Sequence, residues 1–394
     1  MLIISLDAIG DDVFDRLAYR SPNFADLVKQ SQVHRGVSSI FLTNTYPIHA
    51  SIATGLSPKH HGILNNTDPF PARHAKWCYD AGQIKAKTLW QAAAAKGLKS
   101  ATVMWPVTGG AGSIAYNIPE LLIQPNENQI IMNLKYGSKL FQLHMLFKYG
   151  KLLGGKNVRQ PDIDNFSTAC MEYLLRKKKP DLAMLHLTCY DFLCHEHGLN
   201  SPALDIAYEA IDKNLGSLLD AADGQYDILL FSDHSQLPAS NPLLPNELLE
   251  KRGYLQVDNN GEYLPGDCFF ECCGGSAFFH PGEMPRDQIE ELINSVKALD
   301  GFARMLRNDE MDVCGRSELP FGFAAKPDWA CEVYRRGEKA NHGYPVDYDE
   351  YKVFYLCCGD DFAPGLVNGG DLLEVTVHAA SILDLEMKNL QKFK

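Results

Sequence analysis

Aspartate and histidine, two side chains well suited to bind divalent transition metals, recur at four separated places in this sequence. These residues are Asp7, Asp191 with His195, Asp233 with His234, and His342. Each group alone is weak evidence, because an isolated Asp-x-x-x-His pattern occurs by chance more often than as a metal site. Together, three aspartates and three histidines match the ligand set of a two-metal hydrolytic site, and this is the chemistry that we expect.

The spacing within two of these groups indicates what they can reach. Asp191 and His195 lie four positions apart, so a helical turn would place both side chains on one face. Asp233 and His234 are adjacent, so their side chains diverge and can reach two metals roughly 4 Å apart. The spacing is therefore compatible with two neighbouring ions.

Thr45 is the candidate nucleophile. It stands in the stretch F-L-T-N-T-Y-P-I-H, after an expected short strand, and Pro47 suits the first turn of a helix. Thr45 is thus expected at a helix N-terminus, where backbone N–H groups and the helix dipole favour an alkoxide and a bound phosphate. The residues leave one alternative open, which is that Thr45 only caps the helix.

Alternating strand-like and helix-like runs must position these side chains. The sequence predicts strands at residues 2–6, 100–104, 182–187, 228–231 and 353–357, and helices at residues 22–28, 89–96, 203–222 and 371–385. This alternation is typical of an α/β protein with a mostly parallel sheet. Ligands of such sheets bind at the carboxyl ends of the strands, and Asp7, Asp191 and Asp233 each follow a predicted strand.

Two segments interrupt the alternation. Residues 118–159 are apolar and prone to form helices, and residues 237–336 mix turns, aromatic residues and one helix at 286–299. We expect both to be insertions that cap one edge of the sheet. The 394 residues then form a catalytic core of residues 1–236 and 337–394, with the helical insertion within it, and a cap insertion of residues 237–336.

Five ordered motifs resemble the signature segments of the alkaline phosphatase superfamily. They are L-D-A-I-G at residues 6–10, T-N-T-Y-P-I-H at 43–49 with A-T-G-L-S-P-K-H-H-G-I-L-N-N at 53–66, D-F-L-C-H-E-H-G at 191–198, F-S-D-H-S at 231–235 and N-H-G-Y at 341–344. Within the superfamily, the sequence is most similar to the nucleotide pyrophosphatase/phosphodiesterase branch, also called type I phosphodiesterases. The resemblance implies a three-layer α/β fold, with helices on both faces of a mostly parallel sheet and a capping insertion.

The resemblance also implies a role for each matching residue. It implies two metals with three protein ligands each: Asp191, His195 and His342 for one, and Asp7, Asp233 and His234 for the other. Thr45 would bridge toward the second metal as the nucleophile. Asn66 matches the family's phosphate-binding amide, and Tyr46 matches an aromatic position that packs against the substrate.

The ions are expected to be Zn2+, with Mn2+ or Fe as alternatives, because the ligands mix imidazole and carboxylate. Attack by Thr45 on phosphorus would give a covalent phospho-threonine that water hydrolyses.

Nearby residues that match no ligand position are expected to support the site. Four of them are histidines, for which we expect structural roles: His49, His60, His61 and His197. Two others, Cys194 and Ser235, replace glycines that the family usually has beside ligands, so their side chains could crowd the metals or add a ligand.

The segment at residues 104–110, M-W-P-V-T-G-G, bears on the substrate. Relatives that cleave monoesters or phosphonates commonly place a cation there, whereas this segment has none, and its W-P pair resembles the diesterase branch. We therefore expect hydrolysis of phosphodiester or phosphoanhydride bonds. Lys135, Lys139 and Arg159 could still reach the phosphate, which keeps a phosphomonoesterase or phosphonate hydrolase as an alternative. A non-catalytic metal- or nucleotide-binding module is another.

Composition limits the partners. Lysine and arginine total 37 and aspartate and glutamate 49, so the formal net charge of −12 should repel a nucleic acid duplex or an anionic membrane. We expect a small phosphate ester as the substrate and no membrane partner, while the oligomeric state stays open. The strand-like start lacks a leader pattern, and the eleven cysteines include no C-x-x-C pair. These features predict a cytoplasmic protein with reduced cysteines.

Overall fold

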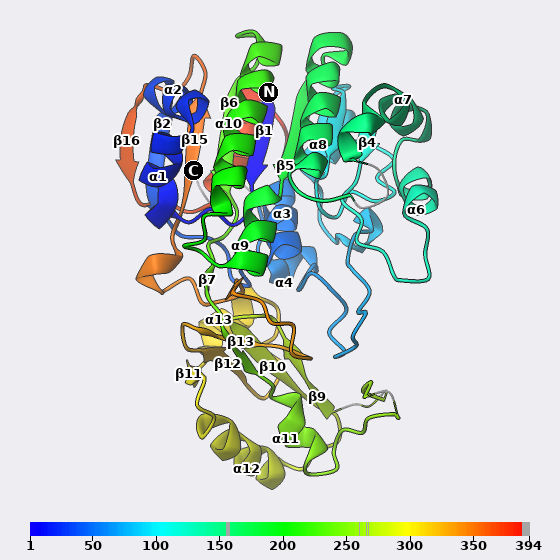
Figure 1. The fold of residues 1–394 in the computed structure, drawn as a ribbon, viewed down its shortest axis with the longest axis vertical. Helices are drawn as coiled ribbons and strands as arrows, with labels where there is room; N and C mark the ends of the chain where they lie inside the picture. Colours follow the sequence, from blue (N-terminus) through cyan, green and yellow to red (C-terminus); the bar gives the residue numbers. More distant parts are fainter. Residues whose placement is uncertain (155–157, 260, 265, 267, 388–394) are drawn as a thin grey trace.

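A mostly parallel sheet forms the centre of the protein (Figure 1). The computed structural model describes residues 1–154, 158–259, 261–264, 266 and 268–387. Within this part of the chain the sheet has eight strands, in the order β16 (Gly365–Asn368), β2 (Gln32–Val37), β15 (Val353–Cys358), β6 (Ile228–Ser232), β1 (Leu2–Leu6), β5 (Leu182–Leu187), β3 (Ser100–Val103) and β4 (Tyr116–Ile118). Strand β15 runs antiparallel to both of its neighbours, whereas the other pairs are parallel.

Helices cover both faces of this sheet, because its central strands are apolar on both sides. Leu2 and Ile4 of β1 pack in one core with residues of α2 (Pro22–Gln30), α8 (Asp162–Tyr173) and α10 (Leu204–Ala222). Ile3, between them, packs on the other side with residues of α3 (Thr45–Thr54), α5 (Leu89–Ala95) and α14 (Glu374–Ile382). The predicted three-layer α/β fold is confirmed.

The predicted elements agree closely with the observed ones. β1 and β5 have the predicted bounds, and the other three predicted strands differ by one residue at one end. The other three strands of the main sheet had no predicted bounds. β2 was expected only as a short strand before Thr45, β4 has only three residues, and β16 is exposed along its length. All eleven cysteines lie in the described part of the chain, and all are free.

Residues after β6 form a second, smaller sheet. Its order is β11 (Phe302–Met305), β12 (Gly322–Ala325), β10 (Ser276–Pro281) and β9 (Cys268–Cys272), and all pairs are antiparallel. Helix α12 (Arg286–Lys297) packs Leu292 and Val296 into an aromatic core of this sheet. Figure 1 shows the sheet beyond the carboxyl ends of the main strands. The segment predicted to be a cap insertion thus contains this second sheet, at the end of the main sheet where ligands of parallel sheets bind.

The helical segment after β4 lies at the edge of the main sheet. It contains α6 (Gln129–Tyr136) and α7 (Lys139–Tyr149), which Figure 1 shows beside β4. Phe141 of α7 packs on Tyr116 of β4, with ring centroids 5.4 Å apart.

In the described part of the chain, every helix is too short or too polar to span a bilayer.

A buried ion pair joins the second sheet to the loops of the core. Arg316 and Glu271 are 3% and 1% exposed, and Arg316 Nε donates to Glu271 Oε2 over 3.0 Å. Glu271 Oε1 also accepts from Asn65 Nδ2, in the loop after α4 (Pro58–His61), over 2.9 Å. Burial would raise the pKa of Glu271, but the Arg316 guanidinium lowers it to about 2. Glu271 is thus a charged anchor between the two parts of the fold.

Arg316→Met is expected to lower the free energy of unfolding by about 3–5 kcal/mol, because it leaves the Glu271 carboxylate buried without its cation. Denaturant unfolding followed by circular dichroism measures the change. Arg73→Met is the matched control, since Arg73 pairs with Glu262 at the surface and its loss should change stability little. A cost for Arg316→Met as small as that of the control would contradict this account.

Candidate metal and catalytic centre

The topology of the main sheet brings the candidate ligands to one edge. Leu6, the last residue of β1, is paired with both Leu187 of β5 and Ser232 of β6. The chain therefore leaves these three strands at the same level, and the residues that follow include Asp7 and Asp233. Because β15 runs in the opposite direction, the loop that precedes it, with His342, reaches the same edge.

The first candidate ligand group consists of Asp191, His195 and His342, whose ligand atoms lie within 4.8 Å of one another. Asp191 is in the first turn of α9 (Cys189–His197), so His195 follows one turn later on the same face, as predicted. His195 Nε2 lies 3.3 Å from Asp191 Oδ1, and the rings of His195 and His342 are 5.2 Å apart. Gln236 Nε2 also donates to Asp191 Oδ1.

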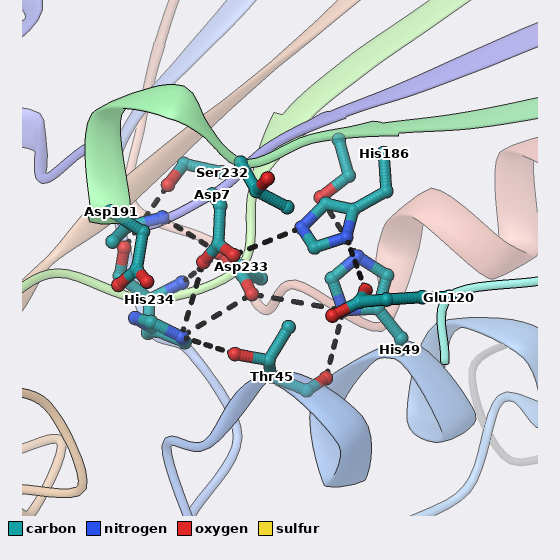
Figure 2. Close-up of polar contacts among 12 residues, drawn as sticks. Asp7, Thr45, His49, Glu120, His186, Asp191, Ser232, Asp233 and His234 are labelled. Carbon is teal, nitrogen blue, oxygen red and sulfur yellow. Dashed lines mark hydrogen bonds and ion pairs between the residues drawn. The ribbon is translucent and has the colours of Figure 1, made fainter. Parts of the chain in front are cut away.

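The second group consists of Asp7, Asp233 and His234, and all three are buried (Figure 2). His234 Nε2 lies 3.5 Å from Asp7 Oδ1 and 3.4 Å from Asp233 Oδ2. Among the described residues, neither of these two buried carboxylate oxygens has a hydrogen-bond partner. Unsatisfied buried anions are costly, and a cation between them would satisfy both, so this donor set fits a metal.

The outer ring nitrogens of the three candidate histidines face oxygen atoms outside the two groups. His234 Nδ1 lies 3.2 Å from the Ser235 carbonyl oxygen, which can only accept, so Nδ1 carries the proton and Nε2 keeps its lone pair. His342 Nδ1 likewise donates over 2.8 Å to Asn44 Oδ1. His195 Nδ1 faces Glu338 Oε2 at 3.6 Å. All three histidines thus present Nε2 to the centre, in the arrangement typical of metal-ligating imidazoles.

The carboxylates carry too much negative charge for an interior. Burial raises the pKa of Asp7 well above its usual value, and Asp233 and Asp191 raise it further. Burial also raises the pKa of Asp233 to about 6. For Asp191, the effect of burial is outweighed by His195, followed by other histidines, and its pKa is lowered. The group is therefore stable at neutral pH only with protons or cations among the carboxylates.

The histidines differ in the protons that they hold. Burial lowers the pKa of His342 to about 3 and that of His234 to about 4, so both are neutral at pH 7. Burial would also lower the pKa of His195, but Asp191 and Glu338 raise it well above its usual value. His195 thus holds a proton that a bound metal would have to displace.

The structure places Thr45 beside the second group. Thr45 is the first residue of α3, and its Oγ1 lies 3.2 Å from His234 Nε2 (Figure 2). The N-cap position belongs to Asn44, so the alternative in which Thr45 only caps the helix does not apply. The hydroxyl lies at a ten-residue helix's N-terminus, where N–H groups and the dipole favour negative oxygen.

Asn66 and Tyr46 meet through the backbone. Tyr46 N donates to Asn66 Oδ1 over 2.8 Å, which leaves the side-chain NH2 of Asn66 as the group that can donate to a ligand. The Tyr46 side chain is 0% exposed and lies 5.2 Å from the Trp77 ring. The Tyr46 ring therefore has no open face for a substrate, in contrast to the expectation that it packs against the substrate. The backbone N–H of Tyr46, not its ring, holds the side-chain amide of Asn66.

Asn65 is a supporting residue that the sequence analysis missed. Its Oδ1 accepts from Asn44 Nδ2 and from the backbone N–H of Asn66, each over 2.8 Å. Because Asn44 Oδ1 also accepts the hydrogen bond from His342 Nδ1, the Asn65 side chain orients both a candidate ligand and the amide next to the nucleophile. Asn65 is held in turn by Glu271 of the second sheet. The Asn65-Asn66 pair in the sequence motif was the available signal. Only the fold shows that Asn65 supports the site while Asn66 can donate to a ligand.

His186 and Glu120 were also missed. His186, in β5, is fully buried, with Nε2 3.2 Å from Asp7 Oδ2 and Nδ1 3.1 Å from Glu120 Oε2. Burial alone would lower the pKa of His186, but Asp7 and Glu120 raise it well above its usual value. The imidazole between two carboxylates therefore orients Asp7 from behind. A histidine within the apolar strand L-A-M-L-H-L was the signal in the sequence.

The remaining histidines near the site have other partners. His49 Nδ1 lies 2.8 Å from the Thr45 carbonyl oxygen and Nε2 lies 3.0 Å from Ser5 Oγ, so both nitrogens are engaged although the ring is close to Asp233. The others contact residues outside the two groups: His60 with Ser57, His61 with Ser51, and His197 with Glu196. Cys194 is buried in the hydrophobic core and belongs to no ligand group among the described residues, and Ser235 Oγ donates to the Gln236 carbonyl oxygen.

Comparisons with known proteins show the family of this chain. Residues 1–344 match the sequence model of the type I phosphodiesterase / nucleotide pyrophosphatase family. Ectonucleotide pyrophosphatase/phosphodiesterase family member 5 of Homo sapiens is 23% identical over 267 residues, which cover 66% of this chain and 50% of the relative. The bis(5'-adenosyl)-triphosphatase enpp4 of Xenopus laevis is 27% identical over 110 residues, or 27% of this chain and 24% of that protein. The chain thus spans at most about half of these relatives.

A solved structure has the same fold. It is an inactive variant of murine ectonucleotide pyrophosphatase / phosphodiesterase 5, in complex with AMP. It aligns with a TM-score of 0.68 and 18% sequence identity, over 98% of this chain and 95% of that chain.

The metal-free protein is expected to take up about two Zn2+ ions per chain and to release protons as it does so. Asp7, Asp233 and His195 have raised pKa values, so their protonated forms gain population as the pH falls and compete with the metal. Affinity should therefore increase with pH. Calorimetric titration in two buffers of different ionisation enthalpy measures both effects.

The control for this titration is Asp191→Asn, which should remove one of the two ions and leave the other. Binding with no proton release, or affinity that does not change with pH, would contradict the assignment.

Proposed function

The chain belongs to the type I phosphodiesterase / nucleotide pyrophosphatase family, and we propose that it is a metal-dependent hydrolase of phosphodiester or phosphoanhydride bonds in small molecules. The observation that carries the proposal is the position of Thr45. Its hydroxyl is 3.2 Å from His234 Nε2, next to two buried carboxylate oxygens and at the N-terminus of α3. A hydroxyl, a cation site and an anion-binding helix end are the parts that phosphoryl transfer to a side chain needs.

The residues present fit two divalent cations, and Zn2+ suits the mixture of imidazole and carboxylate, with Mn2+ or Fe as alternatives. Asp191, His195 and His342 would hold one ion, and Asp7, Asp233 and His234 the other, next to Thr45. When bound, the ions would neutralise phosphate oxygens and lower the pKa of the Thr45 hydroxyl.

Thr45 Oγ1 attacks phosphorus, the bond from Oγ1 to phosphorus forms, and the bond from phosphorus to the leaving oxygen breaks. The hydroxyl proton goes to solvent, and the leaving oxygen takes a proton from solvent. Water then cleaves the phospho-threonine and restores the hydroxyl. Meanwhile the NH2 group of Asn66 and the backbone N–H of Thr45 donate to the phosphate oxygens, since the Tyr46 N–H already donates to Asn66 Oδ1 and Pro47 has no N–H.

A diester or anhydride substrate fits the charge of the site. Among the described residues, no lysine or arginine pairs with Thr45, Asn66 or the candidate ligands, and Lys135, Lys139 and Arg159 are exposed on the helical segment. A monoester would bring one more negative charge without a side-chain cation to meet it. The name of one relative, a bis(5'-adenosyl)-triphosphatase, and the murine structure in complex with AMP support nucleotides as the substrate class.

Thr45→Ala is expected to reduce turnover at least about a thousandfold while the metal content stays unchanged, because the six Asp and His ligands remain. Turnover of a chromogenic phosphodiester and elemental analysis of the same samples measure the two quantities. Thr45→Ser is the matched control and should keep part of the activity, since it retains a hydroxyl. Full turnover by the alanine variant would show that the nucleophile is another group.

Bis-(p-nitrophenyl) phosphate is expected to be hydrolysed faster than p-nitrophenyl phosphate at equal concentration. The two esters share a leaving group, so the comparison isolates the extra negative charge of the monoester. The reverse order would favour a phosphomonoesterase. No turnover of either ester, or of dinucleotides and phosphonates, by fully metal-loaded protein would favour a binding module instead.

A further inference from the structure

The outer face of α6 and α7 is apolar and open to solvent. Five large apolar side chains on these two helices are 50–92% exposed: Ile130, Ile131, Leu140, Leu143 and Phe147. Soluble proteins rarely gather so many exposed large apolar side chains without a partner. Figure 1 shows both helices at the β4 edge of the main sheet, away from the second sheet. We call this surface the α6–α7 face.

The exposed residues of α7 do not contribute to its packing on the core. Its inner side buries Phe141 and Met145 against the sheet. Leu140, Leu143 and Phe147 follow at intervals of three and four residues, so they form one stripe on the outside of the helix. Phe147 and Leu140 are 92% and 86% exposed, which is nearly the full side chain.

Lysines border this stripe. At 100° per residue, Lys139 lies on one flank of the stripe and Lys148 on the other, and Lys135 and Lys151 extend the positive charge to both ends. All four are exposed, and among the described residues none of them forms an ion pair with a carboxylate. Lys148 Nζ lies over the rings of Tyr149 and Tyr173.

The charge of this segment differs from that of the rest of the chain. Residues 128–161 contain five lysines and one arginine and no aspartate or glutamate, although the formal net charge of the chain is −12. At physiological salt, the field of distant acidic residues is screened beyond about 8 Å, so the local positive charge decides a close contact.

We propose that the α6–α7 face binds the surface of an anionic lipid membrane. An apolar stripe between lysines is the pattern of a helix that lies in the membrane interface, with its apolar side chains among the acyl chains and its lysines at the phosphate groups. A second copy of the chain fits less well, because a symmetric contact would bring the same lysines together. This proposal concerns a surface contact without a spanning helix, and it replaces the expectation that the acidic chain has no membrane partner.

Co-sedimentation of the full chain with vesicles tests the proposal. We expect binding to vesicles of phosphatidylcholine mixed with phosphatidylserine, little binding to phosphatidylcholine alone, and weaker binding at high salt. Leu140→Gln with Phe147→Gln should reduce the affinity about tenfold or more, and Lys139→Gln with Lys148→Gln and Lys151→Gln should do the same. Both sets change exposed side chains, so turnover of a soluble ester should be unchanged.

Two matched controls remove the same number of apolar or charged groups elsewhere on the surface. They are Tyr19→Gln with Leu366→Gln, and Lys213→Gln with Lys251→Gln and Lys297→Gln, all at exposed positions. Equal losses in the controls, or no binding to anionic vesicles, would overturn the proposal. Concentration-dependent dimerisation that Phe147→Gln abolishes, without vesicle binding, would overturn it in favour of self-association.

Discussion

Mutual repulsion among buried carboxylates is the constraint on which the centre of this protein depends. The parallel strands β1, β5 and β6 end side by side, so Asp7 and Asp233 meet in the interior, and the partly buried Asp191 lies close to them. Such a cluster is stable only with positive charge or protons, and the surrounding histidines are placed to bind a cation together with the carboxylates. Each turns Nε2 inward, with Nδ1 directed at an oxygen outside the cluster. The close approach of the carboxylates makes the cluster unstable without a cation, and the same close approach would let the cluster bind a cation.

A second layer of polar contacts gives this cluster its orientation. Glu120 and His186 hold Asp7, while Asn65 orients Asn44 and Asn66. Asn65 depends in turn on the buried pair of Glu271 and Arg316. The second sheet therefore does more than cover the site. It supplies a charged anchor for the loops that place the candidate nucleophile and phosphate-binding amide.

The positions of the charged residues predict more about binding than the net charge does. Part of the negative charge of this acidic chain lies in the carboxylates of the candidate site, where cations can bind. In the proposed function, those cations would bind the phosphate of the substrate. At the same time, the chain places an uninterrupted basic segment on one edge of the sheet. Net charge predicts behaviour at long range, whereas contacts within a Debye length depend on which residues share a face.

The sequence by itself determined the fold class, the central strands and the residue types of the candidate site, because apolar runs followed by Asp or His can be read locally. It did not reveal Asn65, His186, Glu120 or Glu271, since each acts through neighbours far away in the chain. Only the tertiary structure showed that β15 is antiparallel, which brings His342 to the site, and that the Tyr46 ring is buried. The tertiary structure also decided the exposure of the apolar stripe on α7. Periodicity in the sequence identifies such a stripe, but only the packing shows whether other parts of the chain cover it.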